Sequence, residues 1–237
     1  MKLSIVSHFY NNEESVSKAV ESYREMSRLH PETFDFVLVD DHSHDAIDAN
    51  LFSDVENLRV FRIIEDVAWN MPAARNIGVQ EAFCDKIVLM DIDHLVDPTQ
   101  IGNLLSDAER LKVGQIGQFR RRKRVKNSDH EWIEIASHIN SFMIHKSDFI
   151  RVGGYEENFS GNYGHEDKFF KVCCRRCNMT EIAFDTTLLV QGRATQQLDR
   201  DKSVNTTKLE NLLRNQTWRA ERYLTYKWEM IHPRNHQ

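Results

Sequence analysis

The chain has 237 residues, which is enough for one large domain or for one domain with a helical appendage. Its 36 acidic and 31 basic residues leave a formal net charge of −5, which excludes a general attraction to nucleic acid. Three of the four cysteines fall within residues 173–177, a spacing that excludes a disulfide framework and indicates reduced thiols in a cytosolic protein.

The first half of the chain alternates apolar runs of strand length with a helical pattern. Asn11 or Asn12 can cap the first helix, because Glu13 and Glu14 follow in the first turn, where the helix dipole favours carboxylates. The expected elements are strands at residues 2–7, 34–40 and 57–64, with a helix between residues 12 and 31. This order predicts an α/β fold with a mostly parallel central sheet flanked by helices.

A second helix and a fourth strand lead to a pair of carboxylates. Pro72 suits the first turn of this helix, and Arg75 lies near its N-terminal end, where a cation would meet a phosphate. The apolar run 87–90 then ends in Asp91-Ile-Asp93. Residues i and i+2 of an extended segment point the same way, so both carboxylates would reach one point beyond a buried strand. Two carboxylates there suit Mg²⁺ or Mn²⁺ bridging to a diphosphate, although an isolated Asp-x-Asp is also common in solvated turns.

A basic hairpin is predicted in the middle of the chain. The run Arg120–Lys126 holds six cations in seven residues, and residues 132–136 alternate as the returning strand would. Two interpretations remain open: a solvated hairpin, and a surface that attracts an anionic acceptor or an anionic membrane. The elements expected around it are a helix at residues 97–111, strands at 114–119 and 139–144, and a short helix at 146–151. No apolar stretch approaches the ~20 residues of a membrane span, so we expect a cytoplasmic protein, soluble or peripheral at the inner face of the membrane.

A glycine-rich segment, residues 159–167, precedes another expected helix. Its glycines allow tight turns, and Glu166 and Asp167 then open the helix. The helix dipole alone can explain carboxylates in this first turn. The alternative is a general base that faces a substrate from a glycine-rich loop.

Two short strands and a long helix are expected to complete the chain. The strands are placed at residues 181–184 and 186–190, and the helix over residues 206–230. This divides the chain into a domain of residues 1–200 and a C-terminal helical extension of residues 201–237. Aromatic residues beside Arg and Lys on that helix fit a membrane-surface role, packing on the domain, or one side of a homodimer.

Four short motifs occur in one order along the chain. Each motif alone is a weak indication of a family, but the four at these spacings are a strong one. They are the opening strand and turn Ser4–Asn11, the strand and Asp-Asp-x-Ser turn Val37–Ser43, the A-R-N-x-G helix Ala73–Gly78, and the D-x-D of Asp91–Asp93. Together they resemble family 2 glycosyltransferases with the GT-A fold, over roughly residues 3 to 190. Further along, Gly153-Gly-Tyr and Gly164-His-Glu-Asp resemble the G-W-G-x-E-D element of β-1,4-galactosyltransferases and chondroitin-type polymerases.

The resemblance implies a nucleotide-sugar at the carboxyl ends of the strands. The implied contacts are Tyr10 and Asp41 at the uracil, His8 and Arg75 elsewhere on the nucleotide side, and Asp91 near the ribose. Asp93 would ligate Mn²⁺ or Mg²⁺, and His94 would either ligate this metal or only face it. Asp167 would act as the base, with Glu166 holding the acceptor or the sugar.

The chain departs from the family pattern in two places. Residues 189–193 contain no histidine, whereas many members place a metal-binding histidine after the last strand, so the third protein ligand is left open. Tyr163 or Asn162 stands where the G-W-G element has Trp, which leaves donor and acceptor specificity open.

The resemblance implies an inverting, metal-dependent glycosyltransferase. It would move galactose or N-acetylgalactosamine from a UDP-sugar to a glycan or glycolipid acceptor of a cell-surface or capsular polysaccharide. The residue types fit a single in-line displacement, which needs one base, Asp167, and one Lewis acid at the leaving diphosphate. One alternative is a catalytically weak or non-enzymatic glycan-binding subunit of the same fold. A nucleotidyltransferase is disfavoured because residues 8–12 hold no glycine-rich, basic phosphate loop.

Overall fold

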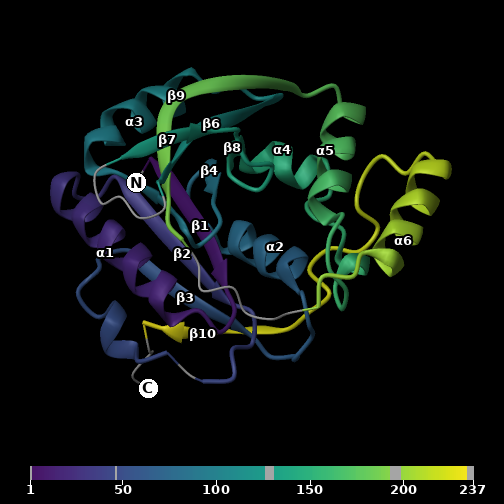
Figure 1. Cartoon of the computed structure of the whole chain (residues 1–237), viewed down its shortest axis with the longest axis horizontal. Coiled ribbons are helices and arrows are strands. Elements are labelled where there is room, and N and C mark those ends of the chain that lie inside the picture. The colour runs from purple at the N-terminus through teal and green to yellow at the C-terminus, as the bar shows by residue number, and fades with distance from the viewer. Residues whose placement is uncertain (1, 46, 126–130, 193–198, 234–237) are drawn as a thin grey trace.

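A computed structural model describes residues 2–45, 47–125, 131–192 and 199–233. A ten-stranded sheet runs through the protein, in the order β10-β3-β2-β1-β4-β8-β6-β9-β5, with β7 paired to β6 (Figure 1). The strands are β1 Leu3–Phe9, β2 Phe34–Asp40, β3 Leu58–Ile63, β4 Lys86–Leu89, β5 His94–Val96, β6 Gln115–Arg124, β7 Trp132–Ile135, β8 Phe142–His145, β9 Thr180–Val190 and β10 Trp228–His232. The helices are α1 Glu13–Leu29, α2 Met71–Glu81, α3 Ile101–Arg110, α4 Lys146–Arg151, α5 Glu166–Arg176 and α6 Ser203–Arg214, with short 3-10 turns at Ala49–Phe52, Pro98–Gln100 and Glu157–Phe159.

The expected α/β fold is confirmed, and its sheet is mixed. Strands β3, β2, β1 and β4 pair in parallel, so their carboxyl ends meet at one edge. Strands β5, β7, β8 and β10 pair with their neighbours in antiparallel fashion. Ligand sites of such sheets lie at the carboxyl ends of the parallel strands, which is where the predicted site residues gather.

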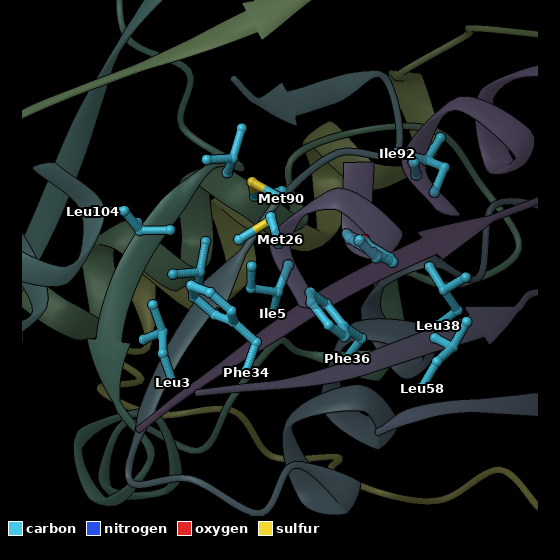
Figure 2. Packing of buried hydrophobic residues seen from close by; sticks show 14 of the residues in the cluster. Leu3, Ile5, Met26, Phe34, Phe36, Leu38, Leu58, Met90, Ile92 and Leu104 are labelled. Atoms are coloured by element: carbon cyan, nitrogen blue, oxygen red, sulfur yellow. The ribbon is translucent and has the colours of Figure 1, made fainter. Parts of the chain in front are cut away.

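Two hydrophobic cores lie on opposite faces of the sheet. Alternate residues of β1 enter different cores, because successive side chains of a strand point to opposite faces. Ile5 packs toward Met26 of α1 in the core that α1 and α3 cover, as Figure 2 shows. Val6 packs instead into the core that α2, α4 and α5 cover. Both faces of the central strands are therefore buried, which explains their continuous apolar runs.

Local signals in the sequence account for most of the helix boundaries. The Asn12 side chain accepts a hydrogen bond from Ser15 N at 3.2 Å and caps α1, as expected. Pro72 lies in the first turn of α2, where its missing N–H costs nothing. The basic run forms the predicted hairpin, with β6 paired to β7, although Lys126 and the predicted turn at residues 127–129 lie outside the described residues.

Three expectations about secondary structure were wrong in detail. His94 belongs to β5, a three-residue strand paired with β9 that is too short to leave a pattern in the sequence. The two strands expected at residues 181–190 are one continuous strand, β9, and the register of its pairing with β6 shifts between Gln118 and Arg120.

The long C-terminal helix is the third error. Helix α6 ends at Arg214, and residues 228–232 form β10 against β3. Tertiary contacts override the helical pattern in this segment, because two buried carboxylates, Glu156 and Glu157, accept hydrogen bonds from backbone N–H groups of residues 221–225. Among the described residues, none of the helices combines the length and apolarity that a membrane crossing requires.

Candidate functional site

The carboxyl ends of the parallel strands open into a cavity of about 610 Å³. It brings together side chains that are far apart in the sequence. They come from the end of β1 (His8, Tyr10), the end of β2 (Asp41), the loop before α2 (Trp69), the end of β4 (Asp91) and the glycine-rich segment (Tyr163, Glu166, Asp167). Predicted site residues from both halves of the chain thus line one cavity.

Asp41 presents a buried carboxyl to this cavity. Its Oδ2 accepts a hydrogen bond from Asn70 N at 3.1 Å, while its buried Oδ1 has no partner among the described residues. Burial raises the pKa of Asp41 well above its usual range, and the nearby charges of Asp40 and Asp66 raise it further. A protonated carboxyl donates one hydrogen bond and accepts others, so Asp41 can pair with a ligand that offers both kinds of group.

Arg75 lies behind the cavity and supports Asp91. Only 1% of its surface is exposed, and its Nη2 donates to Asp91 Oδ1 at 2.7 Å. Its Nη1 donates to Asn140 O at 2.7 Å, and the guanidinium carbon lies 5.6 Å from the ring centre of Tyr155. The expectation that Arg75 lies on the nucleotide side is therefore modified, since its direct partner is the carboxylate of the D-x-D motif.

Asp91 forms a cluster with two histidines. One ligand atom from each of Asp91, His94 and His138 lies within 4.8 Å of the others. His138 Nδ1 donates to Asp91 Oδ2 at 3.0 Å. Sequence reasoning missed His138, because it stands in the loop between β7 and β8 with no motif around it, and the fold alone carries it to Asp91.

The charges of this cluster favour a bound cation. Burial alone would raise the pKa of Asp91, but the hydrogen bond from His138 and the charge of Arg75 outweigh it and hold that pKa well below its usual range. Burial lowers the pKa of His94 to about 4, although Asp91 and Asp93 oppose the shift, so its imidazole is neutral at pH 7. An ionised carboxylate and a neutral imidazole are the protonation states in which these groups bind metals.

Both ring nitrogens of His94 already have partners. Nδ1 lies within hydrogen-bonding distance of Ser141 Oγ, and Arg121 Nη1 donates to Nε2 at 3.1 Å. The same Arg121 donates through Nε and Nη2 to Ala136 O, at 2.8 and 2.6 Å. A metal on His94 Nε2 would therefore take the place of the Arg121 hydrogen bond.

Asp93 occupies a different position from Asp91. It is 7% exposed, its backbone carbonyl accepts a hydrogen bond from Gln191 N at 2.9 Å, and it lies outside the described lining of the cavity. Among the described residues, the group whose ligand atoms lie close enough together to hold a metal ion contains Asp91 rather than Asp93. The backbone turns at residues 92–93 instead of staying extended as expected, yet both carboxylates act electrostatically on His94 and Arg121. The metal-ligand role of Asp93 therefore stays a prediction.

Glu166 and Asp167 face the cavity from the first turn of α5. Burial, and to a smaller extent the charge of the adjacent Asp167, raise the pKa of Glu166 to about 7. His165, just before the helix, adopts a left-handed backbone with φ of +75°, which costs free energy and turns the chain sharply into α5. Buried Asn205 holds the preceding loop, since its Nδ2 donates to the carbonyls of three loop residues at 2.8–3.0 Å.

Comparisons with known proteins place this site in a family. A model of glycosyl transferase family 2 matches residues 4–165. Dodecaprenyl-phosphate galacturonate synthase of Rhizobium johnstonii is 30% identical over 127 residues, which are 52% of this chain and 37% of that protein, so only about a third of the relative's length is matched.

Two crystal structures of residues 1–349 of S. aureus TarS, one in complex with UDP-GlcNAc, have TM-scores of 0.65 and 0.61. They are 14% identical to this chain and cover 94% of it, and the chain covers 68% and 67% of theirs. At this identity the likeness concerns the fold alone, and it confirms the predicted GT-A architecture. Because the family model spans more than half of the sequence, the chain belongs to glycosyl transferase family 2.

Proposed function

We propose that this protein is an inverting, metal-dependent glycosyltransferase that moves a sugar from a UDP-sugar to a glycan or glycolipid acceptor. The observation that carries the proposal is one cavity lined by Asp91 and His138 of the three-residue cluster, by the buried Asp41 carboxyl and by the Glu166–Asp167 pair. Membership of the family leaves the nucleotidyltransferase alternative without support.

Asp41, Tyr10 and His8 would bind the nucleotide. Uracil offers an N–H donor beside two carbonyl acceptors. In the protonated form that burial favours, the Asp41 carboxyl would match this pattern by donating one hydrogen bond and accepting another. Tyr10 at the end of β1 supplies an aromatic ring beside Asp41 in the cavity wall. The UDP-GlcNAc complex of TarS supports a uridine donor.

The proposed donor is a UDP-hexose, and several hexoses are candidates for the transferred sugar. The Gly164-His-Glu-Asp element favours galactose or N-acetylgalactosamine. The sugars named for the two similar proteins, galacturonate and N-acetylglucosamine, extend the set of donors to be tested.

Asp91, His94 and His138 would hold a divalent cation. One carboxylate with two imidazoles suits Mn²⁺ better than Mg²⁺, which prefers oxygen ligands and retains its water. When bound, the cation would neutralise charge on the leaving diphosphate. Arg75 would keep Asp91 ionised and oriented, and Asp93 would add negative charge behind His94.

Asp167 would act as the general base. It would take the proton of the acceptor hydroxyl while the acceptor oxygen bonds to the anomeric carbon and the bond from that carbon to the diphosphate oxygen breaks. The proton ends on Asp167 and the electron pair on the diphosphate, which inverts the anomeric configuration. Glu166, which is largely protonated below pH 7, would donate a hydrogen bond that orients the acceptor or the sugar.

Attachment at the inner face of the membrane is part of the proposal. The β6–β7 hairpin exposes Arg120, Arg122 and Arg124, of which Arg120 and Arg122 form only solvent-exposed ion pairs, with Asp185 and Glu134. Such cations retain most of their attraction for an anionic lipid surface. We also propose that two copies of the chain form a homodimer through their C-terminal regions.

A transfer assay tests the proposed function. With Mn²⁺ and a panel of UDP-hexoses, the protein is expected to release UDP, and EDTA is expected to stop the release until Mn²⁺ is restored. Asp167→Asn is expected to bind UDP as tightly as the wild type and to lose about 10²–10⁴-fold in rate, since a positioned base contributes that much.

Asp85→Asn serves as the control, because this exposed carboxylate stands just before β4 and outside the described lining of the cavity. Full transfer by Asp167→Asn would overturn the assignment of the base, and turnover that persists in EDTA would overturn the role of the metal. A wild-type protein that binds no UDP would refute the proposed function as a whole.

A further inference from the structure

One wall of the cavity carries three cations that the proposed reaction does not use. Lys168, Arg200 and Lys202 all line the cavity on the side of Glu166 and Asp167. None of the three forms an ion pair with a carboxylate in the part of the chain that the structure describes. They are therefore available to an anion, in a protein whose formal net charge is −5.

Two aromatic rings lie in the same wall. The ring centres of Trp69 and Tyr163 are 4.6 Å apart, at an interplanar angle of 51°. The guanidinium carbon of Arg200 lies 5.8 Å from the Tyr163 ring centre, and Lys202 Nζ lies 5.1 Å from it. Aromatic faces beside fixed cations can hold the apolar face of a sugar ring and a charged substituent at the same time.

Contacts of the Trp69 and Lys202 side chains with the backbone of neighbouring segments hold the wall in place. Trp69 Nε1 donates to Asp199 O at 2.8 Å, which ties the loop before α2 to the segment that carries Arg200 and Lys202. Trp69 itself has a φ of +54°, a conformation that a bulky residue adopts only at a free-energy cost and that is typical of functional sites. The aliphatic part of Lys202 packs on Gly164, where an added Cβ would lie 3.3 Å from it.

The position of this wall points to the acceptor rather than to the nucleotide. Tyr163 and Lys168 belong to the same segment as Asp167, the group that would deprotonate the acceptor hydroxyl. The positive charge of Lys202 reaches Glu166, whose pKa it lowers against the larger effect of burial. A neutral acceptor would bring no counter-charge to the three cations beyond the interaction of Lys202 with Glu166.

We propose that the acceptor ends in an anionic sugar, a uronate or a sugar phosphate, whose ring packs on Trp69 and Tyr163 and whose charge binds Lys168, Arg200 and Lys202. This inference rests on the proposed glycosyltransferase function and names its acceptor class. The negative group lies close to the hydroxyl that Asp167 deprotonates. Acceptors without it bind weakly.

Binding of small sugars to the protein saturated with UDP and Mn²⁺ tests this inference. The probes are methyl β-D-glucuronide, glucose 6-phosphate and the neutral methyl β-D-glucoside, titrated by NMR at 50 mM salt. At least one charged probe is expected to bind tenfold or more tightly than the neutral one. The preference is expected to shrink at 500 mM salt, because exposed charges are then screened.

Two variants complete the experiment. The double variant Arg200→Gln, Lys202→Gln is expected to lose the preference for charge while keeping its affinity for UDP. Arg219→Gln is the matched control, because Arg219 lies 5.6 Å over the Trp218 ring in a similar cation–ring pair that is not part of the described cavity lining.

Three results would overturn the inference. Equal binding of charged and neutral sugars would show that the three cations do not select an anionic acceptor. A tenfold loss of UDP affinity in the double variant would assign the cations to the donor diphosphate. Tighter binding of farnesyl phosphate than of either charged sugar would assign the wall to a lipid phosphate. A wild type that fails to bind UDP would instead refute the proposed function, so the two failures are distinguishable.

Discussion

The raised pKa of Glu166 lowers the stability of the folded protein and also suits this side chain to bind a substrate hydroxyl. Its carboxyl stands in the first turn of α5, where burial and the charge of Asp167 raise its pKa to about 7. Arg75 from α2 and Lys202 from the segment before α6 oppose the shift without cancelling it. Near neutral pH the group is thus poised between donating and accepting a hydrogen bond, which suits a residue that orients a substrate hydroxyl.

The raised pKa predicts a pH-dependent cost in stability. Below about pH 4.5 the carboxyl is protonated in both the folded and the unfolded chain, so it costs nothing. Between pH 4.5 and 7 the unfolded chain releases the proton first, and the wild type loses up to about 3 kcal/mol of unfolding free energy. Glu166→Gln avoids this loss, so we expect the variant to match the wild type near pH 4.5 and to be more stable by up to that amount above pH 7.

Urea unfolding at several pH values measures this difference. The exposed Glu56→Gln is the control, and its stability relative to the wild type is expected to change little with pH. A difference between Glu166→Gln and the wild type that stays constant from pH 4.5 to 8.5 would contradict the raised pKa. Transfer activity is expected to fall in Glu166→Gln although the protein gains stability, as is common for active-site residues.

Those residues of the candidate site that belong to a recognisable sequence motif could be predicted from the sequence. The resemblance to family 2 glycosyltransferases placed Tyr10, Asp41 and Asp167 at one site, and all three line one cavity. His138 was not predictable, since a loop histidine has no periodicity and its distance to Asp91 depends on how β6, β7 and β8 pack. The inward turn of Arg75 was missed because a cation on a surface helix and one buried under a carboxylate look identical in sequence.

Helix α2 shows why the A-R-N-x-G pattern contains a glycine. A Cβ at Gly78 would lie 2.4 Å from Val6 Cγ1 in β1 and 3.4 Å from Val39 Cγ2 in β2. The glycine therefore lets α2 lie close against β1 and β2, the strands that Tyr10 and Asp41 follow. Its role is packing, which in turn positions the edge of the sheet.

Substitution of this glycine is expected to destabilise the protein. Gly78→Ala would gain helix propensity, but the clash with Val6 forces the helix away from the sheet, at a net cost of about 1–3 kcal/mol. Gly102→Ala is the matched control, because it also lies in a helix and an added Cβ there meets nothing within 4 Å. The control is expected to gain about 0.5–1 kcal/mol.

Thermal unfolding of the two variants distinguishes the effects. Gly78→Ala should unfold at a lower temperature than the wild type, and Gly102→Ala at an equal or higher one. Equal behaviour of the two alanine variants would mean that α2 can shift without cost, contrary to the tight contact described here.

Elements with strong periodicity were predictable, and those made by tertiary contacts were not. The stripe of α1 and the continuous apolar runs of β1 and β2 required no knowledge of the fold, because both faces of those strands are buried. The segment 215–227 follows a helical pattern yet forms no helix. Its backbone is held by Glu156 and Glu157, which lie 60 residues or more earlier in the chain.

At the scale of the whole molecule, the C-terminal segment completes the sheet. Strand β10 covers the edge of β3, which would otherwise expose unpaired backbone groups (Figure 1). Trp228 Nε1 also donates to Glu81 Oε1 at 2.9 Å, which ties β10 to the end of α2. These contacts join the predicted C-terminal extension to the sheet of the predicted domain, so we propose that the two fold as one unit.

Two buried carboxylates also bind the C-terminal segment, and one of them contacts the middle of α2. Glu157, 1% exposed, accepts from Leu224 N and Thr225 N, both at 2.8 Å, and from Asn76 Nδ2 at 2.9 Å. Glu156, fully buried, accepts from the backbone N–H groups of residues 221 and 222. Without the C-terminal segment, both carboxylates would lose backbone donors while remaining next to the core.

A chain that ends at residue 200 is therefore expected not to fold as an independent domain. Leaving a buried charge without its partners costs about 3–5 kcal/mol each, which is comparable to the whole stability of an ordinary domain. Circular dichroism and thermal unfolding of residues 1–200 should show no cooperative transition, whereas full-length Glu157→Gln, which retains the shape of the side chain, should fold with a lowered midpoint. A cooperative transition of residues 1–200 at the full-length temperature would instead establish residues 201–237 as a separate appendage. It would also mean that β10 and the contacts of Glu156 and Glu157 contribute little to the position of the sheet edge that lines the cavity.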